Sequence, residues 1–304
     1  MKALNCKMKI ILAIIFLSST GLFAQEQVKE LHKEFDTNKS TVLSIDAKFC
    51  DLTLENWDKD QVVFDVTIKA EHSDQEKTKK LLDRIDVEFR KDGNKILVET
   101  VIKDDLSKGK NGKGQKFSII IVAKAPSYVR LDLESKFGST VIETISGGAD
   151  ISSSFGSLEA ERLSGSDLSI SVSHGDFAVG FLGDADIEMS LGTLHIQDAG
   201  NLSLEASQGE VKIGQVKNLS AELSMGDFRI ERIEPSFESI DIEMKTGNVF
   251  LGIDEDAGFT IEAEMKMGNI DIPKSIGTPK TDNMGMNSYI EAKYGNGKSS
   301  ISIE

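Results

Sequence analysis

Glycines recur along most of the chain at intervals of 17 to 21 residues, and the same pattern of apolar residues surrounds each of them. Apolar residues occupy 31 of the 32 positions that lie seven and five before each glycine and two and four after it. Because apolar and polar residues alternate there, each repeat predicts two short, half-buried strands that meet at the glycine. The missing side chain permits a sharp bend, so these are the predicted structural turn glycines. They are Gly138, Gly156, Gly175, Gly192, Gly209, Gly226, Gly247 and Gly268.

A repeat of this length cannot bury an apolar face by itself, whereas stacked repeats can. The pattern therefore predicts an all-β fold, a right-handed single-stranded β-solenoid (β-helix) of about 10 coils of 17–21 residues, with the coils paired in parallel. An antiparallel sandwich would explain the alternation, but not the same residue type at the same position of successive repeats. Cys50 fits the glycine position of an earlier coil, and Ile301 and Ile303 fit the last strand of a C-terminal cap coil.

A short helix and a hairpin interrupt this pattern near the N-terminus. A capping box at residues 73–76, followed by Leu81, Leu82 and Ile85 at helical spacing, predicts the helix. Residues 85–90 and 95–102 predict two strands joined by a turn at Asp92-Gly93. The stretch 104–116 is rich in lysine and glycine and has no apolar anchor, so we expect it to be a loop.

The first 24 residues have the features of a secretory signal peptide. Lysines precede an apolar run at residues 10–17, and Ala24 offers a small residue before the cleavage site. The run is too short to cross a bilayer and no longer one follows, so we expect no integral membrane segment after signal removal. The predicted divisions are the signal peptide (1–24), an N-terminal coil with the helix and hairpin insert (25–130), and the repeats with their cap coil (131–304). We expect the last two to form one continuous domain.

The chain is acidic, with 50 acidic and 35 basic side chains and a net charge of −15 at pH 7. This balance argues against nucleic acid as a partner, because binding phosphates needs a basic surface. Cys50 is the one cysteine outside the signal peptide, which excludes an intramolecular disulfide and a zinc site built from several cysteines. We expect Cys50 to be a buried apolar residue, and methionines beside the glycines, including Met225, to pack in the core.

Outward polar positions form a candidate binding surface. Glutamates recur four positions before the glycine in five successive repeats, and serines recur two positions before it in the middle repeats. Stacked in register, the glutamates would form a carboxylate ladder, and oxygen ligands of this kind suit Ca²⁺. The alternative is a solvated acidic face that keeps an exported protein in solution. No calcium-binding motif and no other cofactor motif is present. The ladder residues are Glu188, Glu205, Glu222, Glu243 and Glu264.

We do not expect an enzyme. A glycosidase needs two carboxylates in different environments, usually within a cleft. Here nearly every neighbouring pair of repeats offers the same pair of carboxylates, and the long loops that build clefts on solenoid enzymes are absent between residues 130 and 272.

The order of these features gives the chain a resemblance to a known family. The features are an N-terminal strand pair ending at Trp57-Asp58, a helical insert, an Ala-Pro turn at residues 125–126 and the glycine repeats. Over roughly residues 30–304 the chain resembles secreted bacterial adhesin-like β-strand repeat proteins, which are domains of unknown function common in Bacteroidota. The resemblance implies a single-stranded β-helix in an exported protein and brings no functional residues with it.

The signal peptide, the repeats and the outer ladders lead to one main hypothesis about function. It is a non-enzymatic, exported β-solenoid that acts as an adhesin-like interaction module, binding an envelope or surface protein or glycan through many weak contacts. A periplasmic accessory or sensor-pathway component of envelope homeostasis is the alternative, and a polysaccharide-cleaving enzyme is a third hypothesis. The expected location is the periplasm, the cell surface or the extracellular space.

Overall fold

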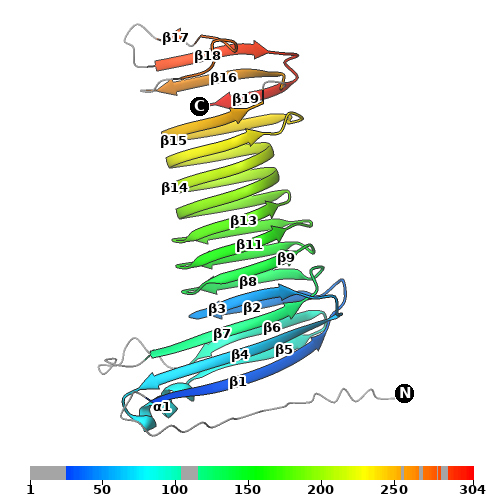
Figure 1. The fold of residues 1–304 in the computed structure, drawn as a ribbon, viewed down its shortest axis with the longest axis vertical. Coiled ribbons are helices and arrows are strands. Elements are labelled where there is room, and N and C mark those ends of the chain that lie inside the picture. The colour runs from blue at the N-terminus through cyan, green and yellow to red at the C-terminus, as the bar shows by residue number, and fades with distance from the viewer. Residues whose placement is uncertain (1–24, 104–115, 255–256, 267–269, 279, 282–286) are drawn as a thin grey trace. The chain divides into compact units, whose positions relative to one another are not determined.

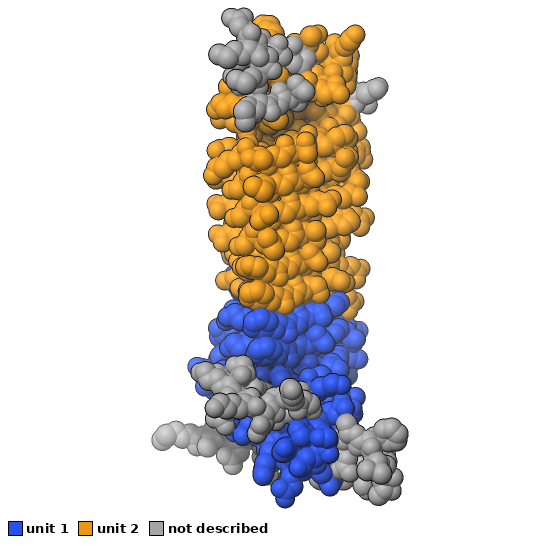
Figure 2. All heavy atoms as spheres, turned by 90° about the vertical axis from the view of Figure 1, so that its left-hand side faces the viewer, with its two compact units in different colours: residues 1–141 blue, residues 142–304 orange. Residues whose placement is uncertain are grey.

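The computed structural model describes residues 25–103, 116–254, 257–266, 270–278, 280–281 and 287–304. The predicted signal peptide, most of the predicted loop 104–116 and Gly268 lie outside these residues. The chain divides into two compact units, Met1–Val141 and Ile142–Glu304, which Figure 2 shows in blue and orange.

The described part of the first unit consists of one helix, α1, and a run of strands (Figure 1). In chain order these are β1 (Gln25–Asp36), β2 (Val42–Lys48), β3 (Cys50–Asn56), β4 (Gln61–His72), α1 (Gln75–Leu82), β5 (Ile85–Asp92), β6 (Lys95–Ile102), β7 (Lys116–Ala125), β8 (Arg130–Lys136) and the start of β9 (Thr140–Ile145).

The pairing of these strands is parallel around the first predicted coil and antiparallel in the insert. Strand β2 lies between β6 and β8 and pairs in parallel with both, and β3 pairs in parallel with β7. Strand β4 pairs antiparallel with β7 on one side and with β1 on the other. Strands β5 and β6 pair antiparallel and form the predicted hairpin. Strand β1 was not predicted. Lys29 and Lys33 occupy its half-buried positions and hide the alternation of apolar residues.

Helix α1 confirms the predicted helix, with a different N-cap. The Asp74 carboxylate, and not the Ser73 hydroxyl, accepts hydrogen bonds from the backbone N–H groups of Glu76 and Lys77, at 2.9 and 3.3 Å. A carboxylate there also interacts favourably with the helix dipole. Leu81 and Thr78 are buried, and the helix packs against β4 and β1. Among the described residues, no helix is long and apolar enough to cross a membrane.

The described part of the second unit is built from short strands and two long ones that run through the turns without interruption. In chain order they are β10 (Ala149–Ser154), β11 (Ser157–Leu163), β12 (Leu168–Ser173), β13 (Asp176–Leu182), β14 (Ala185–Ile233), β15 (Ser239–Ile253), β16 (Phe259–Lys266), β17 (Lys280–Thr281), β18 (Asn287–Tyr294) and β19 (Ser299–Ile303).

Successive repeats of the second unit pair in parallel and in register. Ile151 lies opposite Ile170, and Ile170 lies opposite Ile187, so one repeat position lies beside its counterpart in the next repeat. The second strands of the repeats follow the same rule, with Val179 opposite Ile196. The structure thus confirms an all-β protein with parallel strand pairing between repeats.

The inward positions of the repeats form the core of each unit. Phe177, Phe228 and Phe259 are the largest fully buried side chains of the second unit, and Phe64 has this role in the first. The predicted core positions are buried, with exceptions only in the second strands of the last two repeats. These exceptions, which are half-buried, are Val249, Leu251, Ile270 and Ile272.

The C-terminal end departs from the prediction of a simple last coil. Strand β19 does not follow the last repeat but lies between β15 and β16, in parallel with both. Strand β16 then pairs with β18, and β18 with β17, both antiparallel. Residues 270–278, part of which was predicted as the second strand of the eighth repeat, contain no strand.

Candidate functional site

The turns of the repeats bring the backbones of neighbouring repeats into close contact at the glycine position. A Cβ atom added to Gly192 would lie 1.8 Å from the carbonyl oxygen of Gly175, and one added to Gly209 would lie 2.0 Å from that of Gly192. A Cβ atom added to Gly138 would likewise lie 1.9 Å from the carbonyl oxygen of Cys50. Glycine is therefore needed here for two reasons. A side chain would collide with the backbone of the neighbouring repeat, and glycine has the conformational freedom that the turn requires.

Cys50 occupies the glycine position of the first coil and is almost fully buried. Burial, together with the nearby charges of Asp51 and Asp46, raises the pKa of its thiol to about 12. The thiol stays protonated at neutral pH, so Cys50 is a buried apolar residue and not a nucleophile.

The residue immediately before the glycine position projects into solvent. We call these side chains the turn ladder. In the first unit it comprises Phe49 and Phe137, and in the second unit Phe155, His174, Leu191, Gln208, Met225 and Thr246. The exposed fractions of Phe49, Phe137 and Phe155 are 46%, 47% and 53%, and those of Leu191 and Met225 are 43% and 53%. The prediction that Met225 packs in the core is therefore wrong.

The first four members of the turn ladder have a left-handed backbone that side chains normally avoid. Their φ angles are 55°, 59°, 57° and 57° for Phe49, Phe137, Phe155 and His174. Such a conformation costs a residue with a side chain about 1–2 kcal/mol. Asparagine or glycine would adopt it at lower cost, so the protein holds aromatic side chains at an unfavourable position and leaves them half exposed.

Ring stacking within each unit offsets part of this cost. Phe49 stacks on Phe137 with a centroid distance of 4.8 Å, and Phe155 stacks on His174 at the same distance. A stacked pair contributes about 0.5–1.5 kcal/mol beyond the burial of its area. Two left-handed residues cost about 2–4 kcal/mol, so stacking alone does not explain the choice of residues.

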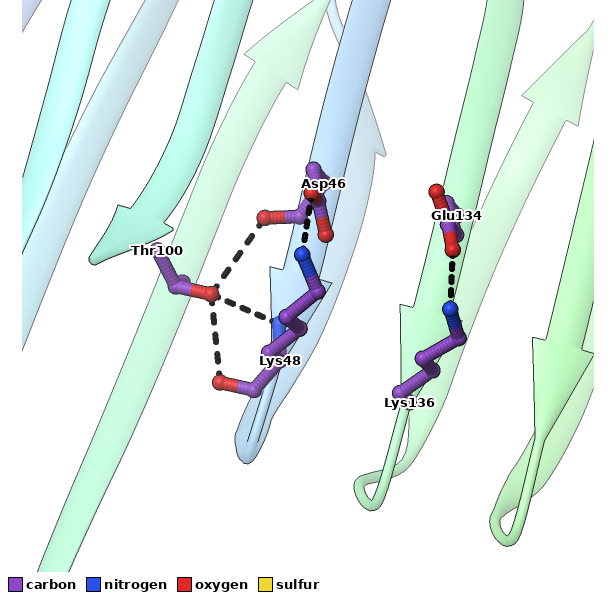
Figure 3. Close-up of polar contacts among 5 residues, drawn as sticks. All are labelled: Asp46, Lys48, Thr100, Glu134 and Lys136. Atoms are coloured by element: carbon purple, nitrogen blue, oxygen red, sulfur yellow. Dashed lines mark hydrogen bonds and ion pairs between the residues drawn. The ribbon is translucent and has the colours of Figure 1, made fainter. Parts of the chain in front are cut away.

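In the first unit, lysines neutralise the outward carboxylates that lie beside the turns. Figure 3 shows the Lys48 ammonium paired with the Asp46 carboxylate on β2, at 2.6 Å, and Lys136 paired with Glu134 on the neighbouring β8. The hydrogen bond from Lys136 lowers the pKa of Glu134, and the bond to Asp46 raises that of Lys48. Thr100 fixes the end of β2 by accepting from the Lys48 backbone N–H at 2.7 Å.

In the second unit, serines replace these lysines next to Glu188, Glu205 and Glu222. These three glutamates are exposed, and Glu222 lies directly opposite Glu243 in the next repeat. Glu205, Glu222 and Glu243 line a depression of about 120 Å³ together with Ser207 and Ser224, and Lys245 lines its edge at the next repeat. The repeats of Glu188, Glu205 and Glu222 therefore carry serine where the first unit has lysine, and lysine returns at this position with Lys245.

The predicted ladder of five stacked glutamates is interrupted before its last member. Because Ile303 of β19 lies opposite both Ile242 and Ala263, β19 separates Glu243 from Glu264. In the part of the chain that the structure describes, no group of three or more His, Cys, Asp or Glu side chains is arranged to hold a metal ion. Calcium binding by the ladder stays a prediction.

A charge substitution distinguishes the two interpretations of the ladder. We expect Glu222→Gln to raise the free energy of unfolding by up to about 1 kcal/mol at low salt, because it removes repulsion between carboxylates roughly 5 Å apart. The gain should fade in 1 M NaCl. Glu134→Gln, which removes the partner of Lys136, is the control and should bring no gain. A rise in Tm specific to Ca²⁺ at matched ionic strength, lost in Glu205→Gln with Glu222→Gln, would instead establish a calcium site.

These features define an all-β repeat protein with parallel stacking and an exposed, partly aromatic turn ladder. A sequence model of the Toastrack DUF4097 family matches residues 41–304, and the chain belongs to this family. This confirms the predicted membership of an adhesin-like family of unknown function. No curated protein sequence matches the chain.

Solved structures similar to the chain come from Bacteroides, Clostridium and Parabacteroides species. A proposed adhesin from Bacteroides fragilis is 12% identical, with 74% of this chain and 97% of that chain covered and a TM-score of 0.44. A proposed cell adhesion protein from Clostridium sporogenes is 12% identical, with coverage of 75% and 99% and a TM-score of 0.28. A proposed lipid-binding protein from Parabacteroides distasonis is 14% identical, with coverage of 74% and 94% and a TM-score of 0.27.

Proposed function

We propose that this protein is a non-enzymatic, exported interaction module of the cell envelope or surface, and that it binds its partner through the turn ladder. The observation that carries the proposal is the left-handed backbone at Phe155 and His174, which holds two stacked rings at a solvent-exposed turn. Backbone strain of this kind is typical of functional sites. Aromatic side chains, Phe among them, are also enriched at the centres of protein–protein interfaces.

The carboxylates beside the ladder indicate the chemistry of the partner. Glu188, Glu205 and Glu222 lie on the same strand segments as the turn residues, three positions earlier in the chain, and serines stand where the first unit has lysines. A partner segment that combines basic and apolar residues would neutralise this row while covering Leu191 and Met225. Repetition along the stack allows many such weak contacts to add.

The proposal includes the finer features predicted from the sequence. These are a right-handed single-stranded β-solenoid of about ten coils, export by the N-terminal signal peptide, and a location in the periplasm or at the cell surface. The parallel registers between repeats support the solenoid course.

Site-specific photo-crosslinking in intact cells or envelope fractions tests the proposed binding surface. We expect a benzophenone amino acid in place of Phe155 or Met225 to capture a discrete partner, because both side chains project from turns and are half exposed. The same group in place of Glu159, which is exposed on the adjacent strand β11, is the matched control and should capture nothing.

A second variant separates binding from folding. Phe155→Gly should leave Tm nearly unchanged, because the relief of left-handed strain offsets the lost stacking on His174. It should reduce capture of the partner by the Met225 crosslinker. Equal capture from positions 155, 225 and 159, or no capture from any of them, would overturn the proposal.

A further inference from the structure

The first unit contains a pocket that is separate from the turn ladder. It lies between the β3–β4 connection and the β7–β8 connection and has a volume of about 420 Å³. This volume is in the range of sites for small molecules. Its lining includes the aromatic residues Trp57 and Tyr128 and the carboxylates of Asp58 and Asp60.

Hydrogen bonds hold both aromatic rings in place. The Trp57 indole N–H donates to the backbone carbonyl of Gln61 at 2.7 Å. The Tyr128 hydroxyl donates to the Asp60 carboxylate at 2.8 Å and lies 3.0 Å from the Thr37 hydroxyl. Rings that are fixed before a ligand arrives lose little conformational freedom on binding, so the pocket is preorganised.

The charges around the pocket favour a cation. The Asp58 carboxylate is exposed and makes no hydrogen bond or ion pair with the described residues. No lysine or arginine lines the pocket, whereas two carboxylates do. The Lys59 ammonium, which lies outside the lining, is 4.6 Å from the centroid of the Trp57 ring. The indole ring thus already attracts a positive charge of the protein itself.

We propose that this pocket binds an organic cation, a small ammonium compound or an ammonium group on a larger molecule, through the Trp57 and Tyr128 rings and the Asp58 carboxylate. Lys59 lowers the affinity for this ligand, because its positive charge near the Trp57 ring repels a second cation. An anionic ligand would meet two carboxylates and is disfavoured.

The single tryptophan of the chain provides a direct measurement. Since Trp57 is the only tryptophan, tryptophan emission reports on this pocket alone. We would titrate the purified protein with tetramethylammonium chloride, using sodium chloride at the same ionic strength as the reference. We expect a saturable change in emission with tetramethylammonium and none with sodium.

Two exposed charge variants test the mechanism. Lys59→Met should lower the Kd roughly three- to tenfold, and Asp58→Asn should raise it by a similar factor. Asp83→Asn, which makes the same charge change on the exposed C-cap of α1, is the control and should leave the Kd unchanged. No saturable response to tetramethylammonium, or a Kd that neither Lys59→Met nor Asp58→Asn shifts, would overturn the proposal. A response to methyl glucoside without one to tetramethylammonium would also overturn it, by assigning the pocket to neutral sugars.

Discussion

Gly209→Ala is expected to lower the free energy of unfolding of the second unit by about 3 kcal/mol or more. The added Cβ would lie 2.0 Å from the carbonyl oxygen of Gly192, and the φ angle of Gly209 is +146°, which side chains rarely adopt. Backbone strain costs about 1–3 kcal/mol, and forcing extra atoms into a packed contact costs a similar amount. Urea unfolding followed by circular dichroism measures the change. Gly209→Val should lower the free energy of unfolding further.

A second glycine in the same unit provides the control for this result. A Cβ added to Gly183 would find its nearest neighbours at 3.5 Å, an ordinary contact distance. Gly183→Ala should therefore change the stability by no more than about 0.5 kcal/mol. If both alanine variants were equally destabilised, these glycines would be needed for their conformational freedom. The close contact between the backbones of neighbouring repeats would then not be the reason.

Ile301→Ala is expected to destabilise the C-terminal end of the second unit by about 2–4 kcal/mol. Ile301 is 1% exposed and lies opposite both Ile240 of β15 and Ile261 of β16, so its truncation leaves a cavity between three strands. Hydrogen exchange measured by mass spectrometry should show faster exchange in β16 and β18, with β10 to β13 unchanged, because the strands near a cavity open first.

Ile303→Ala makes the same chemical change at a half-buried position of β19 and should cost clearly less. Uniform loss of protection from β10 to β18 in Ile301→Ala would contradict the local role of β19 and would indicate that the whole second unit unfolds as one.

The sequence was sufficient to predict the parallel registers because repeat length and alternation together fix them. Ile151, Ile170 and Ile187 occupy one repeat position, and a shift of one residue would turn each of them to the solvent. The position of β19 could not be predicted in this way. Ile301 and Ile303 alternate like the core residues of any repeat, and alternation specifies which face a strand buries but not which strands it pairs with.

The turn ladder was missed for a different reason. Phe137 and Phe155 stand next to a glycine, where the alternation of the strand ends, so no periodic signal assigns them to the core or to the solvent. Both residues have a left-handed backbone, and alternation along a strand gives no information about such a turn. The one signal in the sequence was the recurrence of an apolar residue at this position in several repeats, including Leu191 and Met225.

The place of β19 also constrains the order in which the chain can fold. From β10 to β15, each repeat pairs with the repeat that directly follows it, so this part can assemble stepwise as the chain becomes available. Between β15 and β16 the stack requires a strand that is synthesised after both of them, and contacts between distant segments form slowly. We therefore expect the facing edges of β15 and β16 to stay open, and prone to pairing with other chains, until residues 299–303 reach them.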